Sequence, residues 1–441
     1  MASPAVVYSP HRGLRLLRPA ARPLSLDEVR ERAYRRRVYW AWGLLFLNVV
    51  TFYKGTWNGL PLIFPIPSFI GKILTQGSLP VALLMAISVN RRLLIRPNVY
   101  LGLMTLLVAE AVISGVDPAA GSFIGTTYRT CRLAGFVATL WLLSPLWDRR
   151  DLLLVKCHLA ALFAVLGTVL VGLLLSPGRA LAQGRLSGEL WPITPVQVSD
   201  YSAVALGMII VLWFCGLARR RLMLAAAIGL AVMLFLTHTR TELVALAAGI
   251  IVAGLRLFTV RARVRRVFAA VCLVVAVAVI AFSGEVTTWL IRGENSQELT
   301  DLSGRTTVWS GVLSEPRDRF QVIFGYGLSN KGFGGLPIDS TWIAGYYDLG
   351  LIGVGIVAAM VLFVFTTAYF RPNSPRIAVA LFLVVYLMVT SYTETGLSDA
   401  SAYLLELALA ASLLTPSRGA AHQLPSSEWL IEPSAAERSW A

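Results

Sequence analysis

The run YYDLGLIGVGIVAAMVLFVFTTAYF, residues 346–370, decides the fold class. It is apolar almost throughout after Asp348, and it is long enough to cross the roughly 30 Å of hydrocarbon in a bilayer as one helix. Similar apolar runs recur along the 441-residue chain, which is 56% hydrophobic and only 14% charged. A soluble domain averages about 25% charged residues. The sequence therefore predicts an all-α, polytopic membrane protein.

The apolar runs alternate with connections of two kinds, and arginine-rich segments mark every second connection. The runs lie near 37–53, 67–89, 98–116, 131–147, 152–175, 200–217, 222–238, 243–258, 267–283, 346–370, 377–395 and 400–415, which predicts about twelve spans. Because basic residues in short loops remain in the cytoplasm, we expect the arginine-rich connections and both termini on the cytoplasmic side of the inner membrane. The other connections then lie on the extracytoplasmic face.

The net charge of +15 has a plain explanation in this topology. The cations flank apolar runs, which favours membrane orientation and contact with anionic lipid over binding of nucleic acid. The four cysteines lie in or beside apolar runs without CxxC spacing, so they predict neither a disulfide nor a metal site. We expect no metal and no cofactor.

The predicted organisation has five parts. They are a basic cytoplasmic segment at 1–37, spans one to nine at 38–283, an extracytoplasmic loop at 284–345, spans ten to twelve at 346–415, and a disordered cytoplasmic tail at 416–441. Within the first part a serine-capped helix is predicted at 25–36 and expected to lie on the anionic inner surface. The loop between spans nine and ten is long enough to fold locally and to carry function.

The stretch LSGRTTVWSG, residues 302–311, gives this loop a candidate anion site. A helix is predicted over 305–315, with Val308 and Val312 on one face and Pro316 ending it. Arg305 opens this helix after a glycine, and helix-terminal N–H groups beside an arginine suit a phosphate. The alternative is a solvated loop residue.

Arg240 lies in the tight turn THTRTE, residues 237–242, between two spans. An arginine near bilayer depth costs several kcal/mol unless it is paired or hydrated. It either pairs with Glu242 or snorkels to the interface, or it forms an anion site, because a guanidinium grips phosphate oxygens in a bidentate manner. Other arginines on the predicted outer face are Arg129, Arg132, Arg179, Arg185 and Arg292.

Asp339, in PIDSTW, precedes the tenth span. It is either the N-cap of that helix or a carboxylate that takes a proton from an acceptor hydroxyl. Trp309 either packs on a sugar ring or anchors its helix at the membrane interface. Tyr326, Trp342 and His238 are further candidates for sugar or acceptor contacts.

Four segments resemble motifs of the O-antigen ligase and polymerase superfamily of membrane glycosyltransferases. They are GRLSGELWPITPVQVSDYSA (184–203), THTRTELVALAAGI (237–250), LSGRTTVW (302–309), and FGYGLSN (324–330) followed by DSTWIAGYYDLGLIG (339–353). The resemblance implies about twelve helical spans in a GT-C-like fold, with a partly helical outer loop that caps a cavity and is catalytic.

The same resemblance implies transfer of a glycan from a polyprenyl diphosphate, such as undecaprenyl diphosphate, to a hydroxyl of a glycan, lipid or protein acceptor. The transfer inverts the configuration at the anomeric carbon of the sugar and uses no metal. By position, Arg240, Arg305 and Arg185 match the arginines that bind the diphosphate. Asp339 matches a position where the family carries a catalytic histidine or carboxylate, and the chain departs from the ligases by having aspartate there.

Two other classes remain open at this point. A transporter or flippase of lipid-linked sugars also needs cations in a cavity, but such proteins often contain internal repeats, and none is evident in the sequence. A scaffold of an envelope polysaccharide assembly complex needs no arginine at bilayer depth. The long outer loop after the ninth predicted span favours the enzyme.

Overall fold

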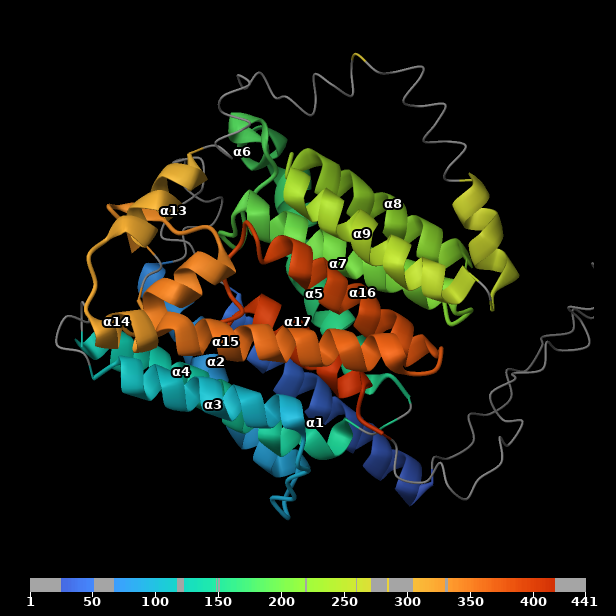
Figure 1. Ribbon diagram of the computed structural model, residues 1–441. Coiled ribbons are helices and arrows are strands. Elements are labelled where there is room, and N and C mark those ends of the chain that lie inside the picture. The colour runs from blue at the N-terminus through green and yellow to red at the C-terminus, as the bar shows by residue number, and fades with distance from the viewer. Residues whose placement is uncertain are drawn as a thin grey trace, which may run out of the picture.

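The computed structural model describes residues 25–50, 67–116, 123–147, 149, 151–218, 220–258, 260–270, 284, 304–329 and 332–416. Most of this part of the chain is helical, and the long helices lie side by side in one bundle (Figure 1). Five of them are long and apolar enough to cross a membrane, at 69–89, 153–175, 195–214, 240–258 and 341–370. The predicted class, a helical membrane protein, is confirmed.

Each long helix overlaps one of the predicted apolar runs, although the first and the fourth begin well before the runs at 37–53 and 131–147. The long helices are α1 (Leu26–Val49), α2 (Ser68–Val89), α3 (Val99–Ser114), α4 (Phe123–Leu143), α5 (Leu153–Leu175), α7 (Pro195–Phe214), α8 (Arg220–Leu236), α9 (Arg240–Phe258), α15 (Thr341–Phe370), α16 (Pro375–Thr390) and α17 (Ala402–Leu413). Most of the ninth predicted span and the whole of the predicted tail after residue 416 lie outside the described residues. The count of twelve spans therefore stays a prediction.

Short elements connect the long helices at one end of the bundle. They are α6 (Pro177–Ala180), the 3₁₀ turn η2 (Ala182–Gly184), α13 (Arg305–Ser314), α14 (Arg319–Phe324) and an antiparallel hairpin of β1 (Gly332–Phe333) and β2 (Leu336–Pro337). A second 3₁₀ turn, η1 (Ser144–Leu146), follows α4. Figure 1 shows α6, α13 and α14 together at the end of the bundle opposite the first residues of α1.

The helix predicted at 25–36 exists, but it is not a separate surface helix. Ser25 accepts a hydrogen bond from the backbone N–H of Glu28, and the Glu28 carboxylate accepts one from the N–H of Ser25, which forms a capping box. From this cap α1 continues without a break to Val49. Since no proline interrupts residues 26–49, the basic turns and the first apolar run form one helix.

The core is centred on α16, which packs against α7, α9, α15 and α17. Two glycines bring the backbones close: a Cβ at Gly207 on α7 or at Gly249 on α9 would overlap the ring of Phe382. Phe382 is fully buried between these helices. Small residues at helix contacts permit the close van der Waals packing that holds membrane helices together.

The two ends of the bundle differ in charge. At one end, Arg149 contacts Glu31 at 2.7 Å and Asp151 at 3.2 Å, and Arg376 donates to the carbonyl oxygens of Trp147 and Ser412. These contacts join the start of α1, the end of α17 and two arginine-rich connections that the sequence assigned to the same face. The opposite end carries α13 and α14 (Figure 1), and the hairpin contacts α13 there.

The glycine-rich segment 325–327 packs against a break in α15. Gly350 has φ +61° and ψ −162°, so the helix is interrupted there, nine residues after it begins at Thr341. The backbone N–H of Tyr326 donates to Tyr347, and that of Gly327 donates to Asp348. A Cβ at Gly350 would overlap the carbonyl group of Ile323, so this close approach requires glycine. The start of α15 at Thr341 lies five residues before the start of the predicted span at 346.

Candidate functional site

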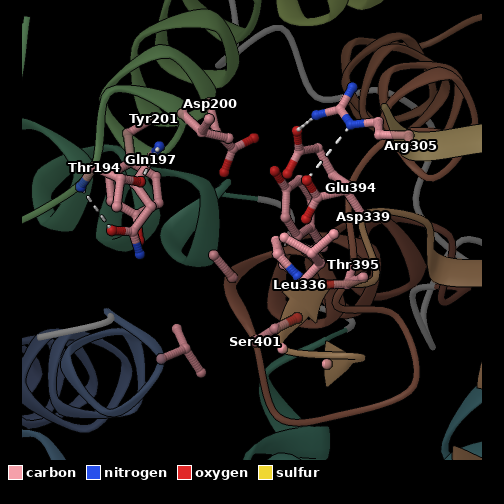
Figure 2. A pocket seen from close by; sticks show the side chains of 17 residues that line it. Thr194, Gln197, Asp200, Tyr201, Arg305, Leu336, Asp339, Glu394, Thr395 and Ser401 are labelled. Carbon is pink, nitrogen blue, oxygen red and sulfur yellow. Dashed lines mark hydrogen bonds and ion pairs between the residues drawn. The ribbon is translucent and has the colours of Figure 1, made fainter. Parts of the chain in front are cut away.

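A cavity of about 820 Å³ opens at the end of the bundle that carries α13 and the hairpin. One wall comes from the start of α7, with Gln197, Asp200 and Tyr201. Figure 2 shows the charged residues of the opposite wall, Arg305, Asp339 and Glu394, with their side chains directed toward one another. The cavity therefore combines one arginine and three carboxylates from four separate parts of the chain.

Arg305 is positioned by the short helix that it begins. The predicted helix is confirmed as α13, which starts after Gly304 at φ +86° and ends at Ser314, two residues before Pro316. Val308 and Val312 lie buried on one face, as predicted, in a cluster with Ile338 and Ala344. This apolar contact fixes α13 against the start of α15 and leaves Arg305 on the cavity wall.

The guanidinium of Arg305 lies between two carboxylates. Its Nε is 3.5 Å from Oδ2 of Asp339, and its terminal NH2 nitrogen is 3.5 Å from Oε1 of Glu394 (Figure 2). The Arg305 side chain is 27% exposed, so it is partly shielded from water and still accessible from the cavity. A planar guanidinium in this position presents the fork of donors that binds carboxylate or phosphate oxygens.

Asp339 is not the cap of the following helix. The N-cap of α15 is Ser340, whose side chain makes no capping hydrogen bond within the described part of the chain, and Asp339 pairs with Arg305 instead. Burial raises the pKa of Asp339, and the neighbouring Arg305 opposes this only in part. With 36% of its side chain exposed, Asp339 is the most accessible carboxylate of the charged wall.

Glu394 is a cavity residue that the sequence reasoning missed. It follows α16, and its carbonyl oxygen accepts a 2.7 Å hydrogen bond from the hydroxyl of Thr341. Its side chain is 14% exposed. Burial raises the pKa of Glu394 well above its usual value, Glu242 raises it further, and Arg305 lowers it. An ionisable residue at the end of an apolar run is itself a signal of a functional site. Glu394, in the segment TETG at 393–396, could have been identified by that signal.

Arg185 lies close to the same group of charges. Its Nε donates to the carbonyl oxygen of Thr237 at 2.9 Å, which holds it against the turn between α8 and α9. Burial lowers the pKa of Arg185, Glu242 and Glu394 oppose that effect, and the charge of Arg305 adds to it. The two predicted arginines therefore interact electrostatically, and a dianion placed beside Arg305 would be attracted by both.

Arg240 is the first residue of α9 and follows a tight turn, as predicted. In that turn His238 has φ +54°, and the hydroxyls of Thr237 and Thr239 are 2.6 Å apart. Glu242, one half-turn further along α9, is fully buried. Arg240 is absent from the lining of the cavity among the described residues. Its role in diphosphate binding stays a prediction.

The four residues predicted to contact sugar or acceptor have packing partners away from the cavity lining that the described residues form. The ring of Trp309 meets Tyr392 edge-on at 5.4 Å, and the indole N–H of Trp342 donates to the hydroxyl of Ser391. Tyr326 packs against Tyr347 at 5.1 Å, and His238 lies 6.0 Å from the ring of Phe235. Among the described residues, the aromatic side chains that line the cavity are Tyr201 and Tyr403.

Two further arginines of the predicted outer face serve to join helices. Arg129 lies 3.8 Å from Asp399, and Arg132 donates to the side chain of Asn48 at 3.2 Å and to its carbonyl oxygen at 3.0 Å. Arg292 lies outside the described residues. The arginines on the predicted outer face therefore have several roles, and joining neighbouring segments is one of them.

Comparison with known proteins bears on the segment that supplies Arg305 and Asp339. Residues 225–349 match the family model described as O-antigen ligase. No curated protein matches the chain. The matched segment includes Arg240, Arg305 and Asp339, and it ends one residue before the break at Gly350. The match confirms, over this segment of the chain, the resemblance to the O-antigen ligase and polymerase superfamily that the motifs indicated.

Proposed function

We propose that this protein transfers a glycan from a polyprenyl diphosphate to an acceptor hydroxyl, with inversion and without a metal, as a polysaccharide polymerase or ligase of the cell envelope. The observation that carries the proposal is the position of Arg305 on the wall of an 820 Å³ cavity, held between Asp339 and Glu394. The family match over 225–349 supports it, because that segment contains the arginine and one of its partners.

The diphosphate of the donor binds to Arg305, and Arg185 adds positive potential beside it. In the structure one carboxylate oxygen of Asp339 and one of Glu394 lie 3.5 Å from nitrogens of the Arg305 guanidinium. Phosphate oxygens take their place when the donor binds. Negative charge grows on the diphosphate as the bond to the sugar breaks. A fixed guanidinium in a partly buried site stabilises that charge without reorganisation. Arg240 is assigned to the same role by its motif.

Asp339 acts as the general base. The acceptor oxygen attacks the anomeric carbon, the bond from that carbon to the diphosphate oxygen breaks, and the leaving diphosphate takes the electron pair. The proton of the acceptor hydroxyl passes to a carboxylate oxygen of Asp339. Burial has raised the pKa of Asp339 toward the working range of a base. Glu394, which is more buried, holds Arg305 in place and is a positioning residue.

The topology is proposed on the distribution of arginines. The connections joined by Arg149, Arg376 and Glu31 lie at one end of the bundle and the cavity lies at the other. By the positive-inside rule, the arginine-rich end is cytoplasmic and the cavity faces outward. We propose about twelve spans in a GT-C-like arrangement, with both termini cytoplasmic and 284–345 as the catalytic loop.

The proposal is tested in cells that lack the native gene and carry variants of it. Arg305→Ala and Asp339→Asn should abolish or sharply shorten the surface glycan, and Arg319→Ala should not. Arg319 is a matched control because it is an exposed arginine that begins the neighbouring helix α14. Glycan length and attachment are measured by gel and composition analysis. Unchanged glycan in both variants, at equal protein abundance in the membrane, contradicts the proposal.

A further inference from the structure

A second hollow lies between α1 and α5, and it is apolar. Its volume is about 360 Å³, and aromatic and aliphatic side chains such as Tyr39, Trp40 and Leu47 line it together with small residues of α5. Among the residues that the structure describes, the polar side-chain groups of the lining are the Tyr39 hydroxyl, the Trp40 indole N–H and the Cys157 thiol, and no charged side chain belongs to that lining. A hollow of this kind inside a membrane-spanning bundle accepts a hydrocarbon chain and excludes a polar ligand.

The shape of the groove comes from small residues facing each other. Gly43 on α1 lies opposite Ala160 and Ala164 on α5, so two helix surfaces that pack together elsewhere leave a channel here. A Cβ at Gly43 would meet no atom within 4 Å, which shows that the space beside this glycine is open. The lining on α1 runs from Tyr39 to Leu47, about 12 Å along a helix axis.

The end of the groove at Leu47 lies near the charged cavity. Leu47 lines the groove, and Val49, two residues further along the same helix, lines the cavity. The ring of Phe46, a groove residue, packs 5.5 Å from the ring of Tyr201, which is a cavity residue. The groove and the cavity are therefore neighbours, with the buried contact between Phe46 and Tyr201 separating them.

We propose that the groove between α1 and α5 holds the first isoprene units of the polyprenyl tail while the diphosphate lies in the cavity. This inference rests on the proposed function, because that function supplies a ligand with a diphosphate head and an apolar tail. The branched methyl groups of the tail need lateral space, which Gly43, Ala160 and Ala164 provide. Binding the start of the tail places the glycosyl diphosphate at Arg305 in a fixed register.

The test fills the groove without disturbing the cavity. Gly43→Leu adds a side chain to open space and replaces a poor helix former with a good one. Gly102→Leu is the matched control, since Gly102 on α3 is also open to added atoms and lines neither the groove nor the cavity. Transfer rates are measured with the same glycan on undecaprenyl diphosphate and on a diphosphate that carries a single isoprene unit, too short to pass Leu47.

For Gly43→Leu we expect the KM for the undecaprenyl donor to rise about tenfold, which is about 1.4 kcal/mol of binding free energy. We expect kcat to stay within about twofold of wild type, and the KM for the single-isoprene donor to be unchanged, because only tail positioning is lost. Gly102→Leu should match wild type with both donors. Equal KM values for Gly43→Leu and Gly102→Leu with the undecaprenyl donor overturn the inference.

A crosslinking experiment separates this inference from the proposed function and from occupancy by ordinary phospholipid. A photoreactive amino acid at Leu47, in protein reconstituted in phospholipid vesicles, should label undecaprenyl diphosphate. Crosslinks to phospholipid should decrease as that compound is added. Phospholipid crosslinks that do not respond to undecaprenyl diphosphate overturn the groove assignment. If wild type transfers glycan from neither donor, the proposed function fails, and this crosslinking result still decides the groove.

Discussion

Replacement of Arg305 by alanine tests the chemistry of the cavity most sharply. The change removes the cation that lies 3.5 Å from both Asp339 and Glu394, and it removes the proposed contact to the leaving diphosphate. Without Arg305, the two carboxylates remain on the same wall beside the buried Glu242, so protonation of Glu394 becomes more favourable. The cavity should persist, because Val308 and Val312 anchor α13 independently of Arg305.

The magnitude follows from the distance that Arg305 keeps to its present partners. Two unit charges 3.5 Å apart interact by about 5 kcal/mol at an effective dielectric constant near 20. Binding of the donor gives up the carboxylate pairs, and the side chain is 27% exposed, so only part of that energy is gained in the transition state. Loss of one donor to a developing oxyanion typically costs about 10²–10³ in kcat. We expect a fall of about 10²-fold or more for Arg305→Ala, and a smaller fall for Arg305→Lys, which keeps the charge and loses the planar fork.

The assay is transfer by purified protein in lipid nanodiscs with a defined polyprenyl-diphosphate oligosaccharide and acceptor. Release of polyprenyl diphosphate gives kcat and KM for each variant, with Arg319→Ala as the control for loss of positive charge near the site. Equal thermal stability of the variants establishes that folding is intact. If Arg305→Ala keeps kcat/KM within about twofold of wild type, the role assigned to Arg305 is wrong.

The remaining predictions concern the base and the break in α15. Asp339→Asn should lower kcat about 10²-fold and leave the KM for the donor unchanged, since only proton transfer is lost; full activity in a steady-state assay contradicts the assignment. For Asp339→His we expect activity that rises with pH through a pKa near 6.5, because the base must be deprotonated. In the wild type, activity should rise through a pKa that is lower than this and higher than that of an ordinary aspartate, near 3.9. Identical pH profiles of kcat/KM for the two proteins argue against Asp339 as the base. Gly350→Ala should lower the thermal unfolding temperature, with a cost of about 1–3 kcal/mol from a strained backbone and a clash with Ile323. Gly355→Ala, in open space on the same helix, should not, and equal unfolding temperatures would show that the break tolerates a side chain.

The sequence predicted the helices well because hydropathy acts over whole spans. The limits of α3, α5 and α9 fall within a few residues of the predicted runs, and the helix at Arg305 begins at the predicted residue. The cap at Ser25 was also predicted, but the extent of α1 was not. A helix cap can be predicted from sequence because it depends on a few adjacent residues. How far a helix continues depends on the absence of any stop signal, which is harder to predict.

The cavity was predicted only in part, because its charges come from distant segments. Arg305 and Asp339 were both identified from the sequence. The contact between them distinguishes the two roles considered for Asp339, helix cap and general base, and no local sequence pattern shows that contact. Glu394 and Asp200 were missed since each is a single acidic residue at the edge of an apolar run. Which way such a side chain faces depends on how α7 and α16 pack. The same limit applies to Trp309, whose partner Tyr392 lies in another loop.

The central claim is that the cavity forms a glycosidic bond at the expense of the diphosphate linkage. The most direct measurement is the stoichiometry of a single incubation of purified wild-type protein with lipid-linked glycan and acceptor. The account predicts one polyprenyl diphosphate released for each new glycosidic bond, with inverted anomeric configuration, and almost none of either with Arg305→Ala. Movement of intact lipid-linked glycan across the vesicle membrane, without release of polyprenyl diphosphate, would contradict the account and identify a transporter.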